Sequence, residues 1–415
     1  MTRNRTISST TTTRLLLAGA VASASLAALT TPAPAAGPRN LPPIVLPTPA
    51  EEGPSIDLVL LLDTSSSMNG LIDQAKAQLW KIVNETADQT RDGEKAKVRV
   101  ALFQYGNDGL PVTENYIRQV VPLTSDLDAV GTALFGLTTN GGSEYCGAVI
   151  DDALGVLDWS TGDDDYRTIF IAGNEPFTQG PIDYRVAVGE AKGRGVVVNT
   201  VHCGPSQAGE SGEWTRAAAI GGGEAFNIDQ DHSPVPQIIC PQDEKLGRLS
   251  LELNETYLWF GDRERRDEAA GAQVANDMRM SRMSPSLAAV RAVTKANSVY
   301  DNAGRDLVDT LAGDVDALPT KLAEVPEDEL PEAMQAMSAN ERVQHVKELA
   351  ERRSSIQAQI QTLAAERATF LAAELARQAD ADAGQVTLGD AVTQAVARQL
   401  EDRGFDKVRP TTRPR

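Results

Sequence analysis

The sequence predicts an α/β fold: a doubly wound, mostly parallel sheet with helices on both faces, followed by an α-helical C-terminal region. Three observations support this prediction. Apolar runs typical of buried strands alternate with helix-patterned segments between residues 55 and 231. Beyond residue 261 the aromatic residues are Tyr300, Phe370 and Phe405 only, so the C-terminal part has few large core side chains. Residues 338–378 contain neither Pro nor Gly, which favours one long helix.

The first strand is the most clearly marked of the alternating elements. Leu58 to Leu62 is an unbroken apolar run, and Asp63 ends it. A parallel strand that is buried on both faces has this pattern. Residues 71–86 then place apolar side chains at helical spacing. Further strands are expected at 98–105, 116–123 (an edge strand), 168–171, 196–201 and 224–228, and further helices at 127–136, 146–158, 184–192 and 213–220.

Composition narrows the class of protein. The 415 residues carry 58 acidic and 39 basic side chains, a formal net charge of −19. Affinity for nucleic acid comes mainly from clustered Lys and Arg, so this charge argues against a nucleic-acid partner. A hydrophobic content of 41% supports a real core and excludes wholesale disorder.

The N-terminus has the features of a secretory signal peptide, expected over residues 1–35. Arginines precede an apolar run from Leu15 to Leu29, and Ala33-Pro34-Ala35 fits a cleavage site. The run is short for a membrane span, which needs about 20 residues, and an uncleaved anchor is the alternative. A Pro-rich linker is expected over residues 36–54. The protein is therefore expected to be exported, periplasmic or extracellular, with no stable membrane anchor after cleavage.

The loop after the first strand is the candidate site. Asp63-Thr64-Ser65-Ser66-Ser67 has the form D-x-S-x-S and lies between a buried strand and a helix. Residues at alternate positions can point the Ser65 and Ser67 hydroxyls at one ion, while Asp63 holds it through water or orients its hydration shell. Hard cations such as Mg²⁺ prefer such oxygen ligands. The alternative is that one of the serines caps the following helix.

In this motif and its strand-to-helix context, residues 55–231 resemble the von Willebrand factor type A (VWA) family. The resemblance implies a Rossmann-like VWA fold, expected over residues 55–255. It also implies a metal-ion-dependent adhesion site that holds Mg²⁺, or Mn²⁺ or Ca²⁺ in its place. In that family an acidic side chain of a protein ligand completes the coordination of the metal.

The family's second element is a Gly-Gly-Thr loop before a helix, in which the hydroxyl is a metal ligand. Here Gly141-Gly142-Ser143 matches it, so the resemblance implies Ser143 as a ligand, with Thr139 as a substitute. Glu144 is either a further ligand or a first-turn residue favoured by the helix dipole.

The third element departs from the family. Gly173 stands where the family has an Asp that binds through water, and Asn174 and Glu175 follow it. Asn174 is a candidate substitute ligand, whereas Glu175 is displaced. Because a carboxylate is missing, Gly173→Asp is expected to strengthen cation binding.

The cysteines Cys146, Cys203 and Cys240 are odd in number. Cys146 starts a helix and Cys203 ends a strand near the same sheet edge, so these two form the expected disulfide; Cys203 with Cys240 is the alternative. A zinc site made of these thiols with His202 and His232 has no standard spacing. The sequence contains no Gly-rich phosphate loop, and no basic side chain is expected beside a thiol, so an enzyme is not expected.

Beyond residue 255 the chain is expected to be helical. Residues 256–337 form a helical connector with an acidic, Pro-containing linker, residues 338–403 a long helix with its partner, and residues 404–415 a basic, disordered tail.

The long helix has a seven-residue repeat, and its apolar members are Leu349, Ile356, Leu363 and Phe370. Arg353 and Arg367 lie on the adjacent row, where a two-stranded coiled coil would have apolar residues. A coiled-coil dimer and an antiparallel hairpin with residues 388–400 therefore both stay open.

Two functions are consistent with these patterns. The first is an exported protein-binding module that uses its metal site to recognise an acidic group of a partner protein. The second is a structural or scaffold protein with a degenerate metal site that interacts through its C-terminal helices; Gly173 favours it. A homo-oligomer through these helices is also open, and the sequence does not identify the protein ligand.

Overall fold

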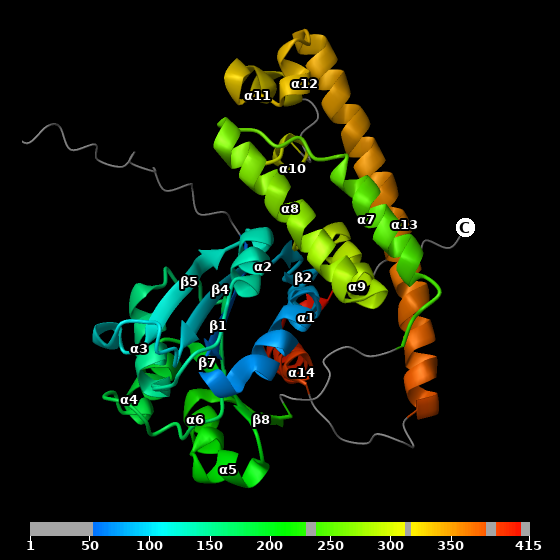
Figure 1. The fold of residues 1–415 in the computed structure, drawn as a ribbon. Helices are drawn as coiled ribbons and strands as arrows, with labels where there is room; N and C mark the ends of the chain where they lie inside the picture. Colours follow the sequence, from blue (N-terminus) through cyan, green and yellow to red (C-terminus); the bar gives the residue numbers. More distant parts are fainter. Residues whose placement is uncertain (1–52, 230–237, 312–316, 379–386, 408–415) are drawn as a thin grey trace, which may run out of the picture. The chain divides into compact units, whose positions relative to one another are not determined.

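The computed structural model describes residues 53–229, 238–311, 317–378 and 387–407, and Figure 1 shows their arrangement. The expected signal peptide, most of the Pro-rich linker, His232 and most of the basic tail lie outside the described residues. Within the described ranges, no helix is both long enough and apolar enough to cross a membrane.

A six-stranded sheet forms the centre of the first part of the chain, in the order β5-β4-β1-β6-β7-β8. Strands β4 and β5 pair antiparallel, and the other neighbours pair parallel. The strands are β1 Ser55–Asp63, β4 Lys97–Tyr105, β5 Ile117–Thr124, β6 Tyr166–Gly173, β7 Val196–Cys203 and β8 Gly222–Ile228. The expected fold class is confirmed, and the antiparallel strand lies at the edge.

Strand β1 is apolar throughout because both faces of the sheet are covered. Leu58 and Leu60 belong to the core on one face, whereas Val59 and Leu61 belong to the core on the other. All of these side chains are buried. The alternation follows from the strand geometry, in which successive side chains point to opposite faces.

Helices cover the two faces of the sheet in separate sets. Side chains of α3, α4 and α6 build one core, and side chains of α1 and α2 build the other. The helices of this part are α1 Asn69–Thr86, α2 Leu127–Phe135, α3 Cys146–Val156, α4 Tyr184–Gly193, α5 Ser206–Ser211 and α6 Trp214–Gly221.

The helical region continues the core on the α1 face. Leu246 and Leu253 of α7, Ala292 of α9 and Ile360 of α13 are buried in the same cluster as Leu58 of the sheet. The elements are α7 Asp243–Asn254, α8 Arg263–Met283, α9 Pro285–Ala296, α10 Leu307–Thr310, α11 Leu318–Glu324, α12 Glu332–Gln335 and α13 Ala339–Gln378. The hydrophobic core therefore extends across residue 255.

A buried charge network also joins the helical region to the sheet helices. The Arg291 Nη2 of α9 lies 2.6 Å from Asp128 Oδ1 of α2, and its guanidinium stacks 4.2 Å from the centre of the Trp80 ring of α1. Asn276 Nδ2 of α8 donates to the same Asp128 carboxylate at 2.9 Å. Such fully desolvated pairs fix one geometry, because losing a partner would leave a buried charge alone.

Helix α14, Leu388–Asp402, packs on α1, β7 and β8. A helix from the C-terminal end of the chain therefore packs against the sheet and helix of its first part. The backbone N–H of Leu388 donates to Gln74 Oε1 of α1 at 2.9 Å, and Thr387 Oγ1 contacts Gln78 Oε1 at 3.0 Å. Strand β9, Asp406–Lys407, then pairs with β2, Gln89–Arg91. The apolar face of α14 is therefore buried against α1 and the sheet, whereas the hairpin that the sequence left open would pack residues 388–400 on α13.

Arg353 and Arg367, which lie beside the apolar repeat of α13, attach this helix to other parts of the same chain. Arg353 is buried and stacks over the Tyr257 ring, with its Nη1 2.6 Å from Asp306 Oδ2. Arg367 Nε donates to Asp243 Oδ1 of α7 at 2.6 Å. Ile356 and Ile360 on the same side of the helix are buried in the shared core. This side of α13 is thus used intramolecularly.

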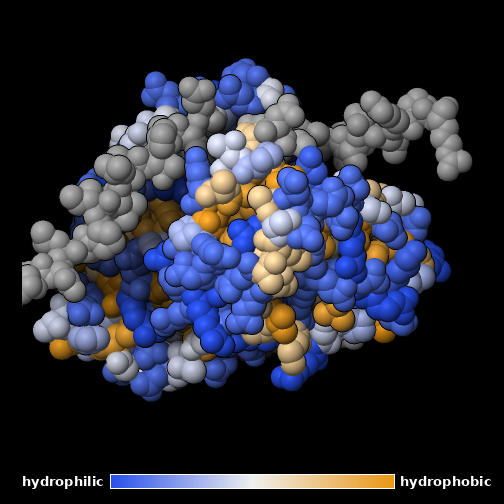
Figure 2. Space-filling model, turned by 90° about the horizontal axis from the view of Figure 1, so that it is seen from above, coloured by the Kyte–Doolittle hydropathy of each residue, from blue (hydrophilic) through white to orange (hydrophobic). Residues whose placement is uncertain are grey.

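Hydrophilic side chains cover most of the face in Figure 2, and separate hydrophobic patches lie between them. Exposed large apolar side chains of the described residues include Val274, Met278 and Met283 of α8. Met280 of the same helix, by contrast, is buried.

Candidate functional site

Three loops meet at the carboxyl end of β1, which lies between β4 and β6. Backbone hydrogen bonds join the first loop to its neighbours: Thr64 N–H donates to Tyr105 O at 2.8 Å, and Ser66 N–H donates to Gly141 O at 2.8 Å. The third loop begins at Gly173, where β6 ends. The carboxyl ends of parallel strands in a doubly wound sheet are where ligands bind.

Asp63 lies at the bottom of this site and is fully buried. Its Oδ1 accepts a 2.7 Å hydrogen bond from the Ser65 backbone N–H, whereas its Oδ2 has no hydrogen-bond partner among the described residues. The Ser65 and Ser67 hydroxyl oxygens lie 3.1 Å apart. The loop therefore places one free carboxylate oxygen close to two hydroxyls, as its alternating pattern predicts.

Glu144 comes from the second loop and is the second buried carboxyl of the site, with 5% of its surface exposed. A Cβ on Gly106 would lie 2.7 Å from Glu144 Cγ and 2.9 Å from Asp63 Oδ1, so both side chains border the space that this glycine leaves open. Gly106 also has a φ of 75°, which L-residues rarely adopt. Like Asp63 Oδ2, Glu144 Oε2 has no partner among the described residues.

The two neighbouring carboxyls are both shifted toward their protonated forms. Burial raises the pKa of Asp63 well above its ordinary value, and the negative charge of Glu144 raises it further. Burial likewise raises the pKa of Glu144. A buried pair of like charges is unfavourable without a cation to neutralise it.

Asn174 contributes from the third loop. Its Nδ2 donates to Ser67 Oγ at 3.1 Å, and its Oδ1 is buried without a partner among the described residues. The site thus brings together Asp63, Ser65, Ser67, Glu144 and Asn174 from all three loops.

This donor set fits a hard divalent cation. Three buried oxygens without partners come from three separate loops, and two hydroxyls lie beside them. Carboxylate, amide and hydroxyl oxygens suit Mg²⁺, Mn²⁺ and Ca²⁺. The described residues hold no group of three or more His, Cys, Asp or Glu side chains arranged to bind a metal, so hydroxyl and amide oxygens are needed to complete any set.

Glu144, rather than Ser143, is the member of the second loop whose side chain reaches Asp63. Ser143 is half-buried. Thr139, the substitute considered from the sequence, instead donates to Asn69 Oδ1 at 2.6 Å.

Tyr105 explains the glycine at position 173, and the sequence alone gave no signal for it. A Cβ on Gly173 would lie 2.5 Å from the Tyr105 hydroxyl oxygen and 3.1 Å from Asp63 Oδ2. The hydroxyl is held in place because it donates to Ala172 O at 3.0 Å. The side chain of Tyr105 thus fills the space that an Asp at position 173 would need, so Gly173→Asp cannot act by simply adding a ligand.

The expected disulfide between Cys146 and Cys203 is wrong. All three cysteines are free and buried. Cys146 belongs to the core on one face of the sheet, and Cys203 belongs to the core on the other. The sheet therefore separates the two thiols. His202, considered as a zinc ligand, has its Nδ1 2.9 Å from Asn227 Oδ1 instead.

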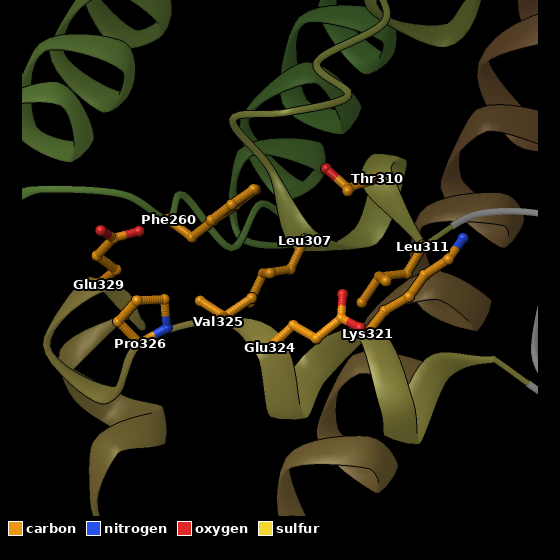
Figure 3. Close-up of a pocket in the computed structure, with 9 residues that line it drawn as sticks. All are labelled: Phe260, Leu307, Thr310, Leu311, Lys321, Glu324, Val325, Pro326 and Glu329. Carbon is orange, nitrogen blue, oxygen red and sulfur yellow. The ribbon is translucent and has the colours of Figure 1, made fainter. Parts of the chain in front are cut away.

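A separate cavity of about 410 Å³ lies in the helical region (Figure 3). Leu307, Leu311 and Val325 form part of its apolar lining, and Lys321 and Glu324 add charged groups. None of the site residues predicted from the sequence lines it.

One family model and several solved structures match part of this chain. The family model of the von Willebrand factor type A domain matches residues 57–232. No curated protein matches the chain. Among solved structures, BatB from Bacteroides thetaiotaomicron is similar at 15% identity and a TM-score of 0.33, covering 42% of this chain and 90% of BatB.

Two further solved structures are similar over the same share of this chain. Proximal thread matrix protein 1 from the mussel byssus, with a zinc-occupied MIDAS motif, has 13% identity and a TM-score of 0.34, covering 43% of each chain. The pilus adhesin SpaC from Lactobacillus rhamnosus GG has 14% identity and a TM-score of 0.33, covering 43% of this chain and 28% of SpaC. Residues 57–232 of this chain are a von Willebrand factor type A domain.

Proposed function

We propose that this chain is an exported, non-enzymatic binding module whose VWA domain holds a divalent cation at the end of β1 and binds a protein ligand through it. The observation that carries the proposal is the set of three buried oxygens without partners: Asp63 Oδ2, Glu144 Oε2 and Asn174 Oδ1. Leaving buried polar groups unpaired is costly, and a bound cation is the partner that this proposal assigns to these oxygens.

In this proposal the cation supplies a Lewis-acid centre for an oxygen ligand of the partner. The chain's own residues would hold the cation. Ser65 and Ser67 supply hydroxyls, and the Asn174 amide N–H donates to the Ser67 hydroxyl. An acidic side chain of the partner protein is the proposed external ligand, with Mg²⁺ as the proposed ion and Mn²⁺ or Ca²⁺ as substitutes.

A second candidate is a scaffold protein with a degenerate metal site that interacts through its C-terminal region, as a monomer or a homo-oligomer. The packing of Tyr105 against Gly173 favours it, because this packing removes a carboxylate position from the site. The side of α13 that carries Ile356 and Ile360 is buried within the chain, so such interactions would use its other sides.

Calorimetric titration of Mg²⁺, Mn²⁺ and Ca²⁺ into the purified exported protein distinguishes the two candidates. The protein should include residues 387–407, because α14 packs directly on α1, which follows the D-x-S-x-S loop. The binding-module proposal predicts saturable binding of one cation per chain. No heat of binding with any of the three ions would favour the scaffold.

A further inference from the structure

Outside the VWA site, a buried lysine lies among three helices of the helical region. Lys295 of α9 has no exposed surface. Its Nζ donates to Ser250 O at 2.8 Å and to Ser250 Oγ at 3.0 Å, both from α7. The same Nζ contacts Asn254 Oδ1 of α7 and lies 2.7 Å from Asp277 Oδ2 of α8. An amine and a side-chain amide are therefore held in direct contact in a dry environment.

Asp277 touches both of these groups with one oxygen. Its Oδ2 accepts from Lys295 Nζ and also, at 2.8 Å, from Asn254 Nδ2. Its other oxygen, Oδ1, accepts from Arg291 Nε at 2.9 Å, which fixes the carboxylate plane. A carboxylate oxygen that bridges an amine nitrogen and an amide nitrogen can take a proton from the first and deliver it to the second.

The protonation states of the cluster suit this transfer. Burial lowers the pKa of Lys295 to about 8, so the neutral amine is more accessible than in an ordinary lysine. Burial opposes ionisation of Asp277, but the charges of Lys295 and Arg291 outweigh it and hold the pKa of Asp277 below its ordinary value. Asp277 is therefore ionised, and it can accept a proton from Nζ once attack on the amide carbon has made that nitrogen acidic. The unprotonated amine is the nucleophile.

We propose that Lys295 and Asn254 join in an intramolecular isopeptide bond, with Asp277 as the proton shuttle. Lys295 Nζ attacks Asn254 Cγ, and the Cγ–Nδ2 bond breaks. Asp277 takes a proton from Nζ and passes it to the departing nitrogen, which leaves as ammonia. One amide replaces another, so the reaction needs no oxidant, reductant or further reactant.

The bond would link the end of α7 to α9 across α8. A covalent link of this kind restricts the unfolded chain as a disulfide does. The three cysteines of this chain are free, so an isopeptide bond would be a covalent brace that the thiols do not provide. It would also hold α9, whose Arg291 pairs with Asp128 of the VWA domain, against α7.

Peptide mapping of the wild-type protein by mass spectrometry tests the proposal directly. Trypsin cleaves after unmodified Lys and Arg, so the unlinked chain yields peptide 249–263 and a cut after Lys295. The proposal predicts instead a branched species that joins 249–263 to an uncut 292–305, lighter than the sum of the two by about 17 Da, the mass of ammonia. Finding 249–263 only as a free peptide would overturn the proposal and leave the cluster as a buried ion pair.

Variants separate the roles within the cluster. Lys295→Arg keeps a buried cation but lacks an amine nucleophile, so the branched species should be absent. Asp277→Asn removes the shuttle and should leave the two peptides unlinked, and Asp277→Glu should restore part of the link. Lys192→Arg, an exposed lysine of α4, is the matched control and should retain the full link. A branched species that persists in Lys295→Arg would contradict the assignment, and the wild-type result stands even where a variant does not fold.

Discussion

The Tyr105 hydroxyl fills the space that a side chain at Gly173 would need, because a Cβ on Gly173 would lie 2.5 Å from the hydroxyl oxygen. The glycine is not required by backbone conformation, since its φ lies outside the left-handed region. The tyrosine is fully buried and cannot move into solvent without disturbing the core of β4.

Gly173→Asp should therefore destabilise the protein instead of strengthening cation binding. Overpacking of this kind costs about 1–3 kcal/mol of unfolding free energy. Urea unfolding of the single variant and of Gly173→Asp/Tyr105→Phe measures the effect. The double variant should regain part of the loss, because the hydroxyl is gone, and should bind Mn²⁺ more tightly than wild type. Equal stability of wild type and Gly173→Asp would show that the clash is relieved elsewhere.

Without a cation, the carboxyls of Asp63 and Glu144 should lower stability as pH rises. Their folded pKa values are raised, so between the ordinary values of 3.8 and 4.5 and the raised values the folded state binds more protons than the unfolded state. Stability must fall with rising pH across that window and then level off. Thermal melts in chelator from pH 4 upwards should show this fall, and Glu144→Gln should reduce it. A fall of equal size in the variant would contradict the coupling of the two groups.

Removing the cap of α14 should cost stability, because this helix completes the packing of the VWA domain. The Thr387 hydroxyl takes part in a capping box with Asp390. Thr387→Ala should lower the free energy of unfolding by about 1 kcal/mol. Thr393→Ala on the same helix is the control, since its hydroxyl bonds only within the helix, to Gly389 O and Asp390 O. Equal losses in the two variants would argue against a specific capping role.

Arg353 and its neighbour Arg352 allow the stability contribution of a buried ion pair to be compared with that of an exposed one. Arg353 Nη1 is 2.6 Å from the buried Asp306, whereas Arg352 pairs with Glu255 at the surface. Arg353→Ala leaves a buried carboxylate uncompensated and should cost about 3–5 kcal/mol. Arg352→Ala should cost less than about 1 kcal/mol. Chemical denaturation of both variants checks this difference, and similar midpoints would contradict the docking role of Arg353.

The fold and the first loop could be predicted from sequence because their signals are local. The apolar run that ends at Asp63 specifies a buried strand and a residue at its end, and the D-x-S-x-S spacing specifies two hydroxyls beside it. The edge position of residues 117–124 likewise follows from their mixed pattern.

The remaining features depend on contacts between distant segments. Nothing near Gly173 in sequence shows that Tyr105 fills its side-chain space, and nothing near Cys146 or Cys203 shows that a sheet lies between them. The apolar face of α14 fits either a helical hairpin or the sheet, and only the long-range contacts of Gln74 and Gln78 decide between them.

The central claim, a cation held by the loop after β1, is tested most directly by calorimetric titration of Mn²⁺ into three forms of the exported protein. Ser65→Ala/Ser67→Ala removes both hydroxyls that face the site, and Ser66→Ala removes the exposed hydroxyl between them. The account predicts one Mn²⁺ per chain in the wild type and in Ser66→Ala, and loss of binding in the double variant with an unchanged far-UV circular dichroism spectrum. Unchanged Mn²⁺ affinity in the double variant would contradict the metal site.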